Sequence, residues 1–279
     1  MINDNYQENK QLFNDILNRN YFNNFKNKSD RFEIFIKGSC SNQCNYCYLG
    51  KYHEKLYPKK IENNDIILKN IEILIKWYIE NNFTCEIDLF SGEWLTSELC
   101  FPILDILYNN FKNIPLVYRP CKIVIPDSMN FLNNIELTNQ IQNYINKFKK
   151  ELFIPFYISA SIDGKYCDSF PKTDLFYERC SSFCQQNDFG FHPMISSTNI
   201  SNWINNYEWF KTIIPLDYLH KKMYLLEVRD ETWNNNNIQN FLNFLNYFID
   251  DKFINTFHSN INEFTKYIFK LDKYKYWQT

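Results

Sequence analysis

The sequence Cys40-Ser41-Asn42-Gln43-Cys44-Asn45-Tyr46-Cys47 spaces three cysteines as C-x3-C-x2-C directly after the apolar run 32–36. Three thiolates on one short loop can hold three corners of an iron–sulfur cube, because the irons of such clusters take cysteine ligands. A site with three cysteines leaves one iron open to an outside ligand, as catalytic metal sites keep an open position that structural sites close. The stretch therefore predicts an open iron–sulfur centre at the end of the first strand.

Two other interpretations of the same cysteines stay open. Cys40, Cys44 and Cys47 could form a Cys3His zinc tetrahedron with His53. Cysteine is also common as a small buried hydrophobic residue, so inert thiols are the third interpretation.

The composition limits the class of protein. A chain of 279 residues, 45% of them hydrophobic, can bury a large core. The net charge of −2 provides no basic field, so we expect no nucleic-acid partner. The sequence has neither a signal-like N-terminus nor an apolar run of about 18 residues, so we expect no membrane span. Nine cysteines without a disulfide-like spacing suit a reducing compartment, which predicts a cytoplasmic protein.

Strand-like and helix-like segments alternate along the chain. In the segment 63–81 apolar residues return every three or four positions, as in an amphipathic helix. Such alternation predicts βα units around a parallel sheet. The strand-like runs lie near 32–37, 85–90, 115–125, 153–162, 189–196 and 223–229, and the helix-like runs near 5–28, 63–81, 97–112, 135–150, 173–187, 200–213 and 234–254.

Several of the strand-like runs are polar on one face. In 157–163, the side chains of Ser159, Ser161 and Asp163 alternate with an apolar set, and 85–90 carries two carboxylates in the same way. Because side chains two positions apart share a face of a strand, the apolar face can lie under the helices while the polar face lines a shared interior. This pattern favours a wide or incomplete barrel with a working lumen over a closed, fully packed one.

The cysteine spacing, with the aromatic Tyr46 directly before the third cysteine, resembles the signature of the radical S-adenosylmethionine (radical SAM) superfamily. The resemblance implies an α/β fold with a partial (β/α)6 TIM-like barrel at 31–232. Helical extensions would then lie at 1–30 and at 233–279, and a truncated C-terminal end stays an open alternative.

The resemblance also implies the chemistry. A [4Fe–4S] cluster on Cys40, Cys44 and Cys47 would reductively cleave S-adenosylmethionine (SAM) to a 5′-deoxyadenosyl radical, which abstracts hydrogen from a substrate. Tyr46 would then belong to the cofactor site. Two non-enzymatic alternatives are a zinc-stabilised interaction module and a radical SAM barrel that has lost activity and only binds a partner.

The end of the second strand looks like the Gly-Gly-Glu-Pro element of that superfamily. It departs from the element at Ser91, in place of the first glycine, and at Trp94, in place of proline. The resemblance implies that the stretch Ser91, Gly92 and Glu93 binds the methionine ammonium of SAM. A carboxylate suits an ammonium because it accepts charge-assisted hydrogen bonds. A solvated loop carboxylate is the alternative for Glu93.

The end of the fourth strand resembles the Ser-x-Asp-Gly ending of the peptide-modifying branch, whose members often carry SPASM domains. The resemblance implies that Ser161, with Ser159 as second choice, reaches the SAM ribose, and that Arg179 pairs with the SAM carboxylate. Asp163 would then lie one step nearer the substrate. An Asx-type turn is the other interpretation of Asp163, and a surface charge that of Arg179.

Further polar residues of the later strands would also face the lumen and the substrate. They are His192, Glu227 and Arg229. The segments 191–196 and 226–233 look like peptide maturases of the superfamily, which implies a peptide or protein substrate. The resemblance also implies a flavodoxin- or ferredoxin-type electron donor.

The chain departs from those maturases because no cysteine follows Cys184, so the auxiliary-cluster domain that they usually carry is not evident. Cys167, Cys180 and Cys184 could form an auxiliary cluster instead. Buried core thiols are the alternative, since Cys180 and Cys184 lie four apart on one predicted helix face.

Overall fold

The computed structural model describes residues 31–35, 40, 42, 44, 46, 47, 63–90, 92–168, 172–228 and 232–250. The described helices and strands are, in chain order, β1 (Arg31–Phe35), α4 (Asn64–Glu80), β2 (Glu86–Phe90), η2 (Trp94–Thr96), α5 (Cys100–Phe111), η3 (Leu116–Tyr118), β3 (Ile123–Asp127), η4 (Asn130–Asn133), α6 (Ile135–Asn146), η5 (Lys147–Glu151), β4 (Phe156–Ala160), α7 (Asp174–Asn187), β5 (Met194–Ile195), η6 (Ile200–Asn202), α8 (Trp203–Ile213), α9 (Leu216–Lys222), β6 (Leu226–Glu227) and α10 (Asn235–Asp250). The predicted helix at 5–28 lies outside the described residues.

The described residues fall into two compact units. The first lies within 1–40, 54–126 and 134–157, and the second within 41–53, 127–133 and 158–279. The predicted domain boundaries after residues 30 and 232 stay predictions.

Strands β1 to β4 form one sheet in that order among the described residues. The pairs Arg31↔Glu86 to Phe35↔Phe90 join β1 to β2 in parallel, and β2 pairs with β3 in the same sense. The N–H of Ile123 donates to the carbonyl of Pro155, and the N–H of Ser161 donates to that of Asp127, both at 2.8 Å. The direction of β4 is therefore parallel too, and the predicted α/β class with a parallel sheet is confirmed.

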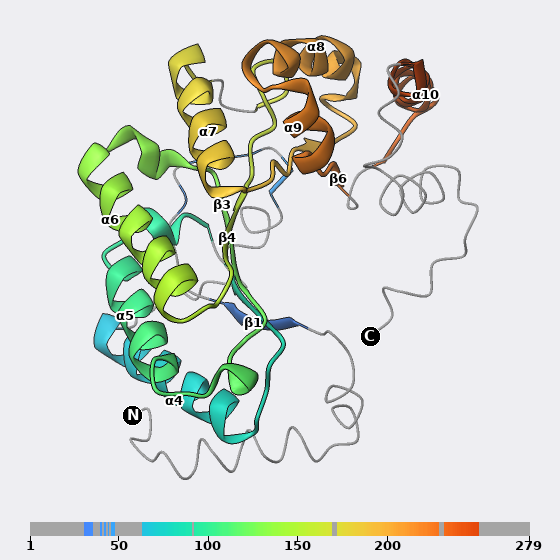
Figure 1. Cartoon of the computed structure of the whole chain (residues 1–279). Coiled ribbons are helices and arrows are strands. Elements are labelled where there is room, and N and C mark those ends of the chain that lie inside the picture. The colour runs from blue at the N-terminus through green and yellow to red at the C-terminus, as the bar shows by residue number, and fades with distance from the viewer. Residues whose placement is uncertain are drawn as a thin grey trace. The chain divides into compact units, whose positions relative to one another are not determined.

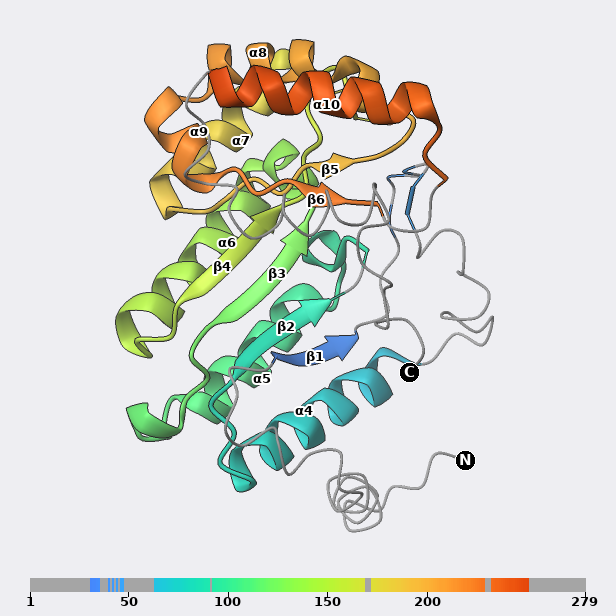
Figure 2. The same cartoon turned by 90° about the vertical axis from the view of Figure 1, so that its right-hand side faces the viewer.

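In the first unit, helices α4, α5 and α6 lie on one face of the sheet (Figure 1). Figure 2, turned by 90°, shows β1, β2 and β3 side by side. Ile75, Tyr78 and Leu107 of the helices and Ile87 and Leu89 of β2 are fully buried. Apolar strands and apolar helix faces thus form the core of this unit, as the helical period of 63–81 predicts.

The second unit contains the helices α7, α8, α9 and α10 and the strand pair β5 and β6. These two strands are parallel, and Met194 pairs with Leu226. Isolated parallel bridges join Ala160 to Phe191 and Phe191 to Met223. Helices α8 and α10 run side by side (Figure 2), and the rings of Trp203 and Phe244 lie 5.4 Å apart. The chain after β4 therefore continues with parallel pairing, although the regular strands are short.

The third strand differs from the prediction. We expect a strand near 115–125, but Leu116–Tyr118 is a 3-10 helix and β3 begins only at Ile123. Pro115 precedes the turn, and the side-chain Nε of Arg119 donates to the carbonyl of Ile114 at 2.7 Å, which stabilises a turn. The short helix α9 is also absent from the sequence prediction, because Leu219 is its one buried residue. Among the described residues no helix is long and apolar enough to cross a membrane.

Two carboxylates of β2 are buried on the sheet. Asp88 is 4% exposed, and its Oδ2 lies 3.4 Å from Nη1 of Arg31. Glu86 is held by Lys122, whose Nζ lies 2.6 Å from Oε2. Burial raises the pKa of Asp88 to about 7, and the neighbouring Glu86 adds to the rise.

Asp88 therefore makes folding depend on pH. Its pKa in the unfolded chain is about 3.9, so the folded state binds the proton more tightly. The stability that this proton contributes is full below about pH 4 and is lost as the pH rises through about 7. The wild type loses this stability as the pH rises, but Asp88→Asn does not. The unfolding free energy of the variant minus that of wild type should therefore be about 2 kcal/mol larger at about pH 8 than at about pH 5. Urea unfolding at both pH values measures this gain, and Glu72→Gln, at a half-exposed position of α4, is the control. If the stability difference between Asp88→Asn and wild type does not change with pH, the raised pKa of Asp88 is contradicted.

Candidate functional site

The cysteine segment of the second unit is described at Asn42, Cys44, Tyr46 and Cys47. The N–H of Cys47 donates to the carbonyl of Cys44 at 3.0 Å, which closes a turn between these two cysteines. Cys44 and Cys47 form no disulfide and are half-buried, and Cys40, which belongs to the first unit, forms no disulfide and is exposed. Thiols that are at least partly exposed can serve as ligands or nucleophiles.

The cysteines proposed for an auxiliary cluster have different surroundings. Cys167, Cys180 and Cys184 are buried, and burial raises the pKa of each thiol. A metal binds the thiolate, which such surroundings disfavour. The geometry therefore favours the core-thiol interpretation for these three residues.

A buried hydrogen-bond network connects the cysteine segment to the end of β4. The hydroxyl of Tyr46 donates to Oδ2 of Asp163. The N–H of Met194 donates to Oδ1 of Asp163 at 2.7 Å, and the N–H of Asp163 donates to Oδ1 of Asp168 at 3.0 Å. The hydroxyl of Tyr177 donates to the other oxygen of Asp168. The buried Asp163 and the half-buried Asp168 thus join the cysteine segment, the end of β4, α7 and β5.

The network has unusual electrostatics because Asp163 is buried and Asp168 is half-buried beside it. Burial raises the pKa of Asp163 to about 8, Asp168 adds to the rise, and the hydrogen bonds from Tyr46 and Met194 reduce it. Burial also raises the pKa of Asp168, which Tyr177 partly offsets. Burial and the Asp163 carboxylate raise the pKa of Tyr46 well above its usual range. The Tyr46 hydroxyl therefore keeps its proton and acts as a donor.

A small hollow, the Cys44 hollow, lies between the cysteine segment and the end of β4. The residues that line it are Asn42, Cys44, Tyr46, Ser128, Ser161, Ile162, Asp168 and Lys172. Its volume is about 20 Å³, which is room for one water molecule. The Nζ of Lys172 donates to Oδ1 of Asn130 and, at 3.4 Å, to Oδ1 of Asn42, and it lies 4.9 Å from the centre of the Phe176 ring. A cation therefore sits beside the cysteine segment.

The structure brings Ser161 to Cys44, since both line the Cys44 hollow and Ser161 is exposed. Ser159 has another partner: its hydroxyl lies 2.5 Å from Nδ1 of His192. The His192 ring also packs edge-on against Tyr224, with ring centres 5.2 Å apart. The serine predicted first for the ribose thus lies beside the cysteine segment, while Ser159 and His192 bind each other.

Two other predicted cofactor residues are held by the protein itself. Nη1 of Arg179 donates to the carbonyl of Leu132 at 3.2 Å, and Nε donates to that of Leu175 at 3.3 Å. In the first unit, Glu93 follows β2 with only 3% of its surface exposed, and its carbonyl accepts from Thr96 at 3.0 Å. Glu93 is therefore a buried carboxylate, which the sequence alternative of a solvated loop residue does not describe.

Several sequence predictions fall where the structure gives little or no information. Ser91, Arg229 and His53 lie outside the described residues. Glu227 pairs with Ile195 in the strand pair, and its side chain is not described. Gly92 is half-buried in the loop after β2. Their roles stay predictions.

Sequence reasoning missed the polar residues that complete the site. Asp168, Lys172 and Tyr177 lie close together in the chain, and Asn130, 42 residues before Lys172, meets them only in the fold. None follows a motif, and Lys172 stands before α7 like an ordinary solvated lysine. Asp168, five residues after Asp163, offered the one signal, because polar residues just beyond a strand end gather near the site of a parallel sheet.

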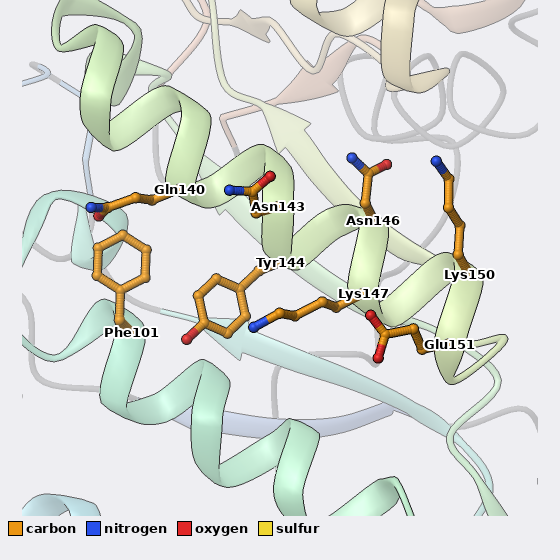
Figure 3. Close-up of a pocket in the computed structure, with 8 residues that line it drawn as sticks. All are labelled: Phe101, Gln140, Asn143, Tyr144, Asn146, Lys147, Lys150 and Glu151. Atoms are coloured by element: carbon orange, nitrogen blue, oxygen red, sulfur yellow. The ribbon is translucent and has the colours of Figure 1, made fainter.

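A larger hollow lies in the first unit between α5 and α6 (Figure 3). Its volume is about 600 Å³, and it is lined by Phe101, Gln140, Asn143, Tyr144, Asn146, Lys147, Lys150 and Glu151. The rings of Phe101 and Tyr144 stack 5.6 Å apart, and Nζ of Lys147 lies 4.7 Å from the centre of the Tyr144 ring. Lys147 already has a partner in this hollow, the Tyr144 ring. None of the residues that the sequence singles out lines it.

Comparison with known proteins assigns no family, since neither a protein-family model nor a curated protein matches this chain. Within the residues that the structure describes, no three or more histidine, cysteine, aspartate or glutamate side chains are arranged to hold a metal ion.

Gly164, four residues after the end of β4, has a positive φ of +96°. A Cβ at this position would lie 2.6 Å from Oδ1 of Asn206 and 2.8 Å from the Phe210 ring. Gly164→Ala should therefore lower the unfolding free energy by about 2–4 kcal/mol through backbone strain and overpacking. Urea denaturation measures the loss, and Ser161→Ala at an exposed neighbouring position should stay within about 0.5 kcal/mol of wild type. An unchanged Gly164→Ala would refute this account of the turn.

Proposed function

We propose that this chain is a radical SAM enzyme that acts on a peptide or protein. The carrying observation is the C-x3-C-x2-C segment with Tyr46, which follows β1 of a parallel α/β sheet. Its described thiols form no disulfide and are exposed or half-buried, and Ser161 shares the Cys44 hollow with one of them. The resemblance to the radical SAM superfamily is the reason for assigning these cysteines to a cluster and Ser161 to SAM.

The donor type suits a [4Fe–4S] cluster, although the described side chains are not already gathered into a metal site, so binding the cluster would have to draw the three thiols together. Cys40, Cys44 and Cys47 form no disulfide and have access to solvent, whereas the thiols of α7 are buried. Thiolates are the ligands that iron–sulfur clusters use, and a set of three leaves one iron for SAM. When bound, the cluster and SAM would supply a 5′-deoxyadenosyl radical that takes hydrogen from the substrate. The residues of the chain would bind and orient the cofactor and exclude water from it.

The finer fold that we propose is the partial (β/α)6 barrel. The bridges from Ala160 to Phe191 and from Phe191 to Met223 support it, because they extend the parallel order past β4. The strand pair β5 and β6 adds the last two strands in the same sense. In folds built from βα units, the carboxyl ends of the strands carry the active site.

Within this proposal, Glu93 would accept the ammonium of SAM, and Ser161 would reach the ribose. Glu93 is buried at 3% exposure, and a buried carboxylate favours a cationic partner. Arg179 is less suited to the SAM carboxylate than the sequence suggests, because carbonyl oxygens already occupy its guanidinium. A flavodoxin- or ferredoxin-type donor and a reducing, cytoplasmic setting belong to the same proposal.

The cluster is the first test of the function. Anaerobic reconstitution should give a brown protein with about four irons per chain. Cys40→Ala, Cys44→Ala and Cys47→Ala should each abolish the visible absorption, whereas Cys121→Ala, an exposed cysteine outside the motif, should retain it. A colourless protein with one zinc per chain that His53→Ala releases would favour the zinc-stabilised module instead.

Binding of SAM separates an enzyme from an inactive barrel. Glu93→Gln keeps the shape and removes the charge, so it should weaken SAM binding by roughly 10- to 150-fold and leave the cluster spectrum intact. Calorimetry on cluster-loaded protein measures this loss, and Glu98→Gln, an exposed neighbour, should not change the affinity.

Reduced wild-type protein should also release 5′-deoxyadenosine from SAM. Cluster-loaded protein that neither binds nor cleaves SAM would support the inactive barrel and refute the enzyme.

A further inference from the structure

Tyr46 stands between Cys44 and Cys47, and its hydroxyl is bonded to a residue far along the chain. The acceptor, Asp163, is only 1% exposed. A buried carboxylate requires hydrogen-bond donors. The half-buried Tyr46 supplies one of them, and breaking this bond would leave Oδ2 of Asp163 without that donor inside the second unit.

We infer that Asp163 is a positioning residue, whose carboxylate holds Tyr46 and, through it, the turn that carries Cys44 and Cys47. This role replaces the substrate contact that the sequence suggests for Asp163. The inference rests on the proposed function for what the cysteines bind, but the hydrogen bond itself does not depend on that function.

Asp163 can hold the turn because it is itself fixed from several sides. Its Oδ1 accepts from the N–H of Met194 at 2.7 Å, and its own N–H donates to Asp168 at 3.0 Å. Its carbonyl accepts from Nδ2 of Asn206 on α8 at 2.6 Å. A side chain held by neighbouring elements in this way positions its partner more firmly than a free one.

A second attachment lies on the other side of Cys44. Nδ2 of Asn130 donates to Oδ1 of Asn42 at 3.3 Å, and Nζ of Lys172 donates to the same oxygen at 3.4 Å. Cys44 thus lies in sequence midway between two anchored residues, Asn42 and Tyr46. The Tyr46 bond ends on Asp163, which is only 1% exposed, so its loss should free the Cys44–Cys47 turn most.

The test measures how fast each cysteine reacts. Full-length protein, freed of metal with a chelator, is treated with iodoacetamide, and each thiol is followed by mass spectrometry. In Tyr46→Phe, alkylation of Cys44 and Cys47 should accelerate by about fivefold or more, because a buried hydrogen bond that held the turn closed is lost. Exposed Cys121 should keep its wild-type rate, and buried Cys184 should stay unreactive, which verifies that the fold persists.

Tyr177→Phe is the matched control. It removes the same hydroxyl from the same buried network, at Asp168 rather than at the cysteine segment. The rates at Cys44 and Cys47 should then stay within about twofold of wild type. Asp163→Ala, which removes the acceptor, should accelerate both cysteines, and the double variant with Tyr46→Phe should react no faster than the faster single variant, because both changes break one bond.

Wild-type rates in Tyr46→Phe, an equal acceleration in Tyr177→Phe, or additive effects in the double variant would each overturn the inference. The measurement needs no cluster, so failure of the iron test above leaves it intact. In iron-loaded protein, the same variants should lose iron to a chelator about fivefold faster, while Tyr177→Phe should match wild type.

Discussion

A carboxylate that leaves water has to find its hydrogen-bond donors inside the protein, and Asp163 finds them in different segments. Tyr46 of the cysteine segment and Met194 of β5 donate to its side chain. Its own backbone binds Asp168, and Asn206 of α8 binds its carbonyl. Because each missing donor costs free energy, the second unit can form around Asp163 only when all of these segments are in place. The geometry near the cysteines follows from this one requirement.

The strands reflect a related compromise between burial and polarity. Strands covered on both faces are usually apolar throughout, yet β2 carries Glu86 and Asp88, and β4 carries Ser159. The protein stabilises each polar group locally, with Arg31 and Lys122 at β2 and with His192 at β4. Burying polar groups on a sheet costs desolvation free energy, which a fully apolar strand does not lose. Their presence is what the proposed working interior of the barrel would require.

The parts of the fold that follow from local pattern could be predicted from the sequence. Helix α4 matches the period of its apolar residues, and α7 begins after a capping residue, Thr173, whose hydroxyl accepts from the N–H of Phe176. The strand near 115–125 could not be placed, because Leu116 and Val117 are apolar but exposed. An apolar run predicts a buried strand only where no local interaction favours a turn. Here Pro115 and the hydrogen bonds of Arg119 favour the turn at Leu116–Tyr118.

The site divides in the same way. The cysteines and Ser161 could be singled out because they belong to motifs with a local spacing. Lys172 and Asn130 could not, since their contact joins residues 42 apart with no trace in either segment. Asp163 was noticed for its motif, but its partner Tyr46 lies 117 residues away, and spacing says nothing about such a pair.

That long separation also orders events during synthesis. A ribosome adds about 5–20 residues per second, so Tyr46 emerges roughly 6–23 seconds before the residue that will hold it, which lies 117 positions later. During that interval the Cys44–Cys47 turn has no Asp163 to bind, and its thiols are open to oxidants and to stray metal ions. The finished cysteine segment is therefore a late product of folding. Under the proposed function, cluster assembly would have to wait until synthesis has passed residue 163 of 279, or the thiols would need protection until then.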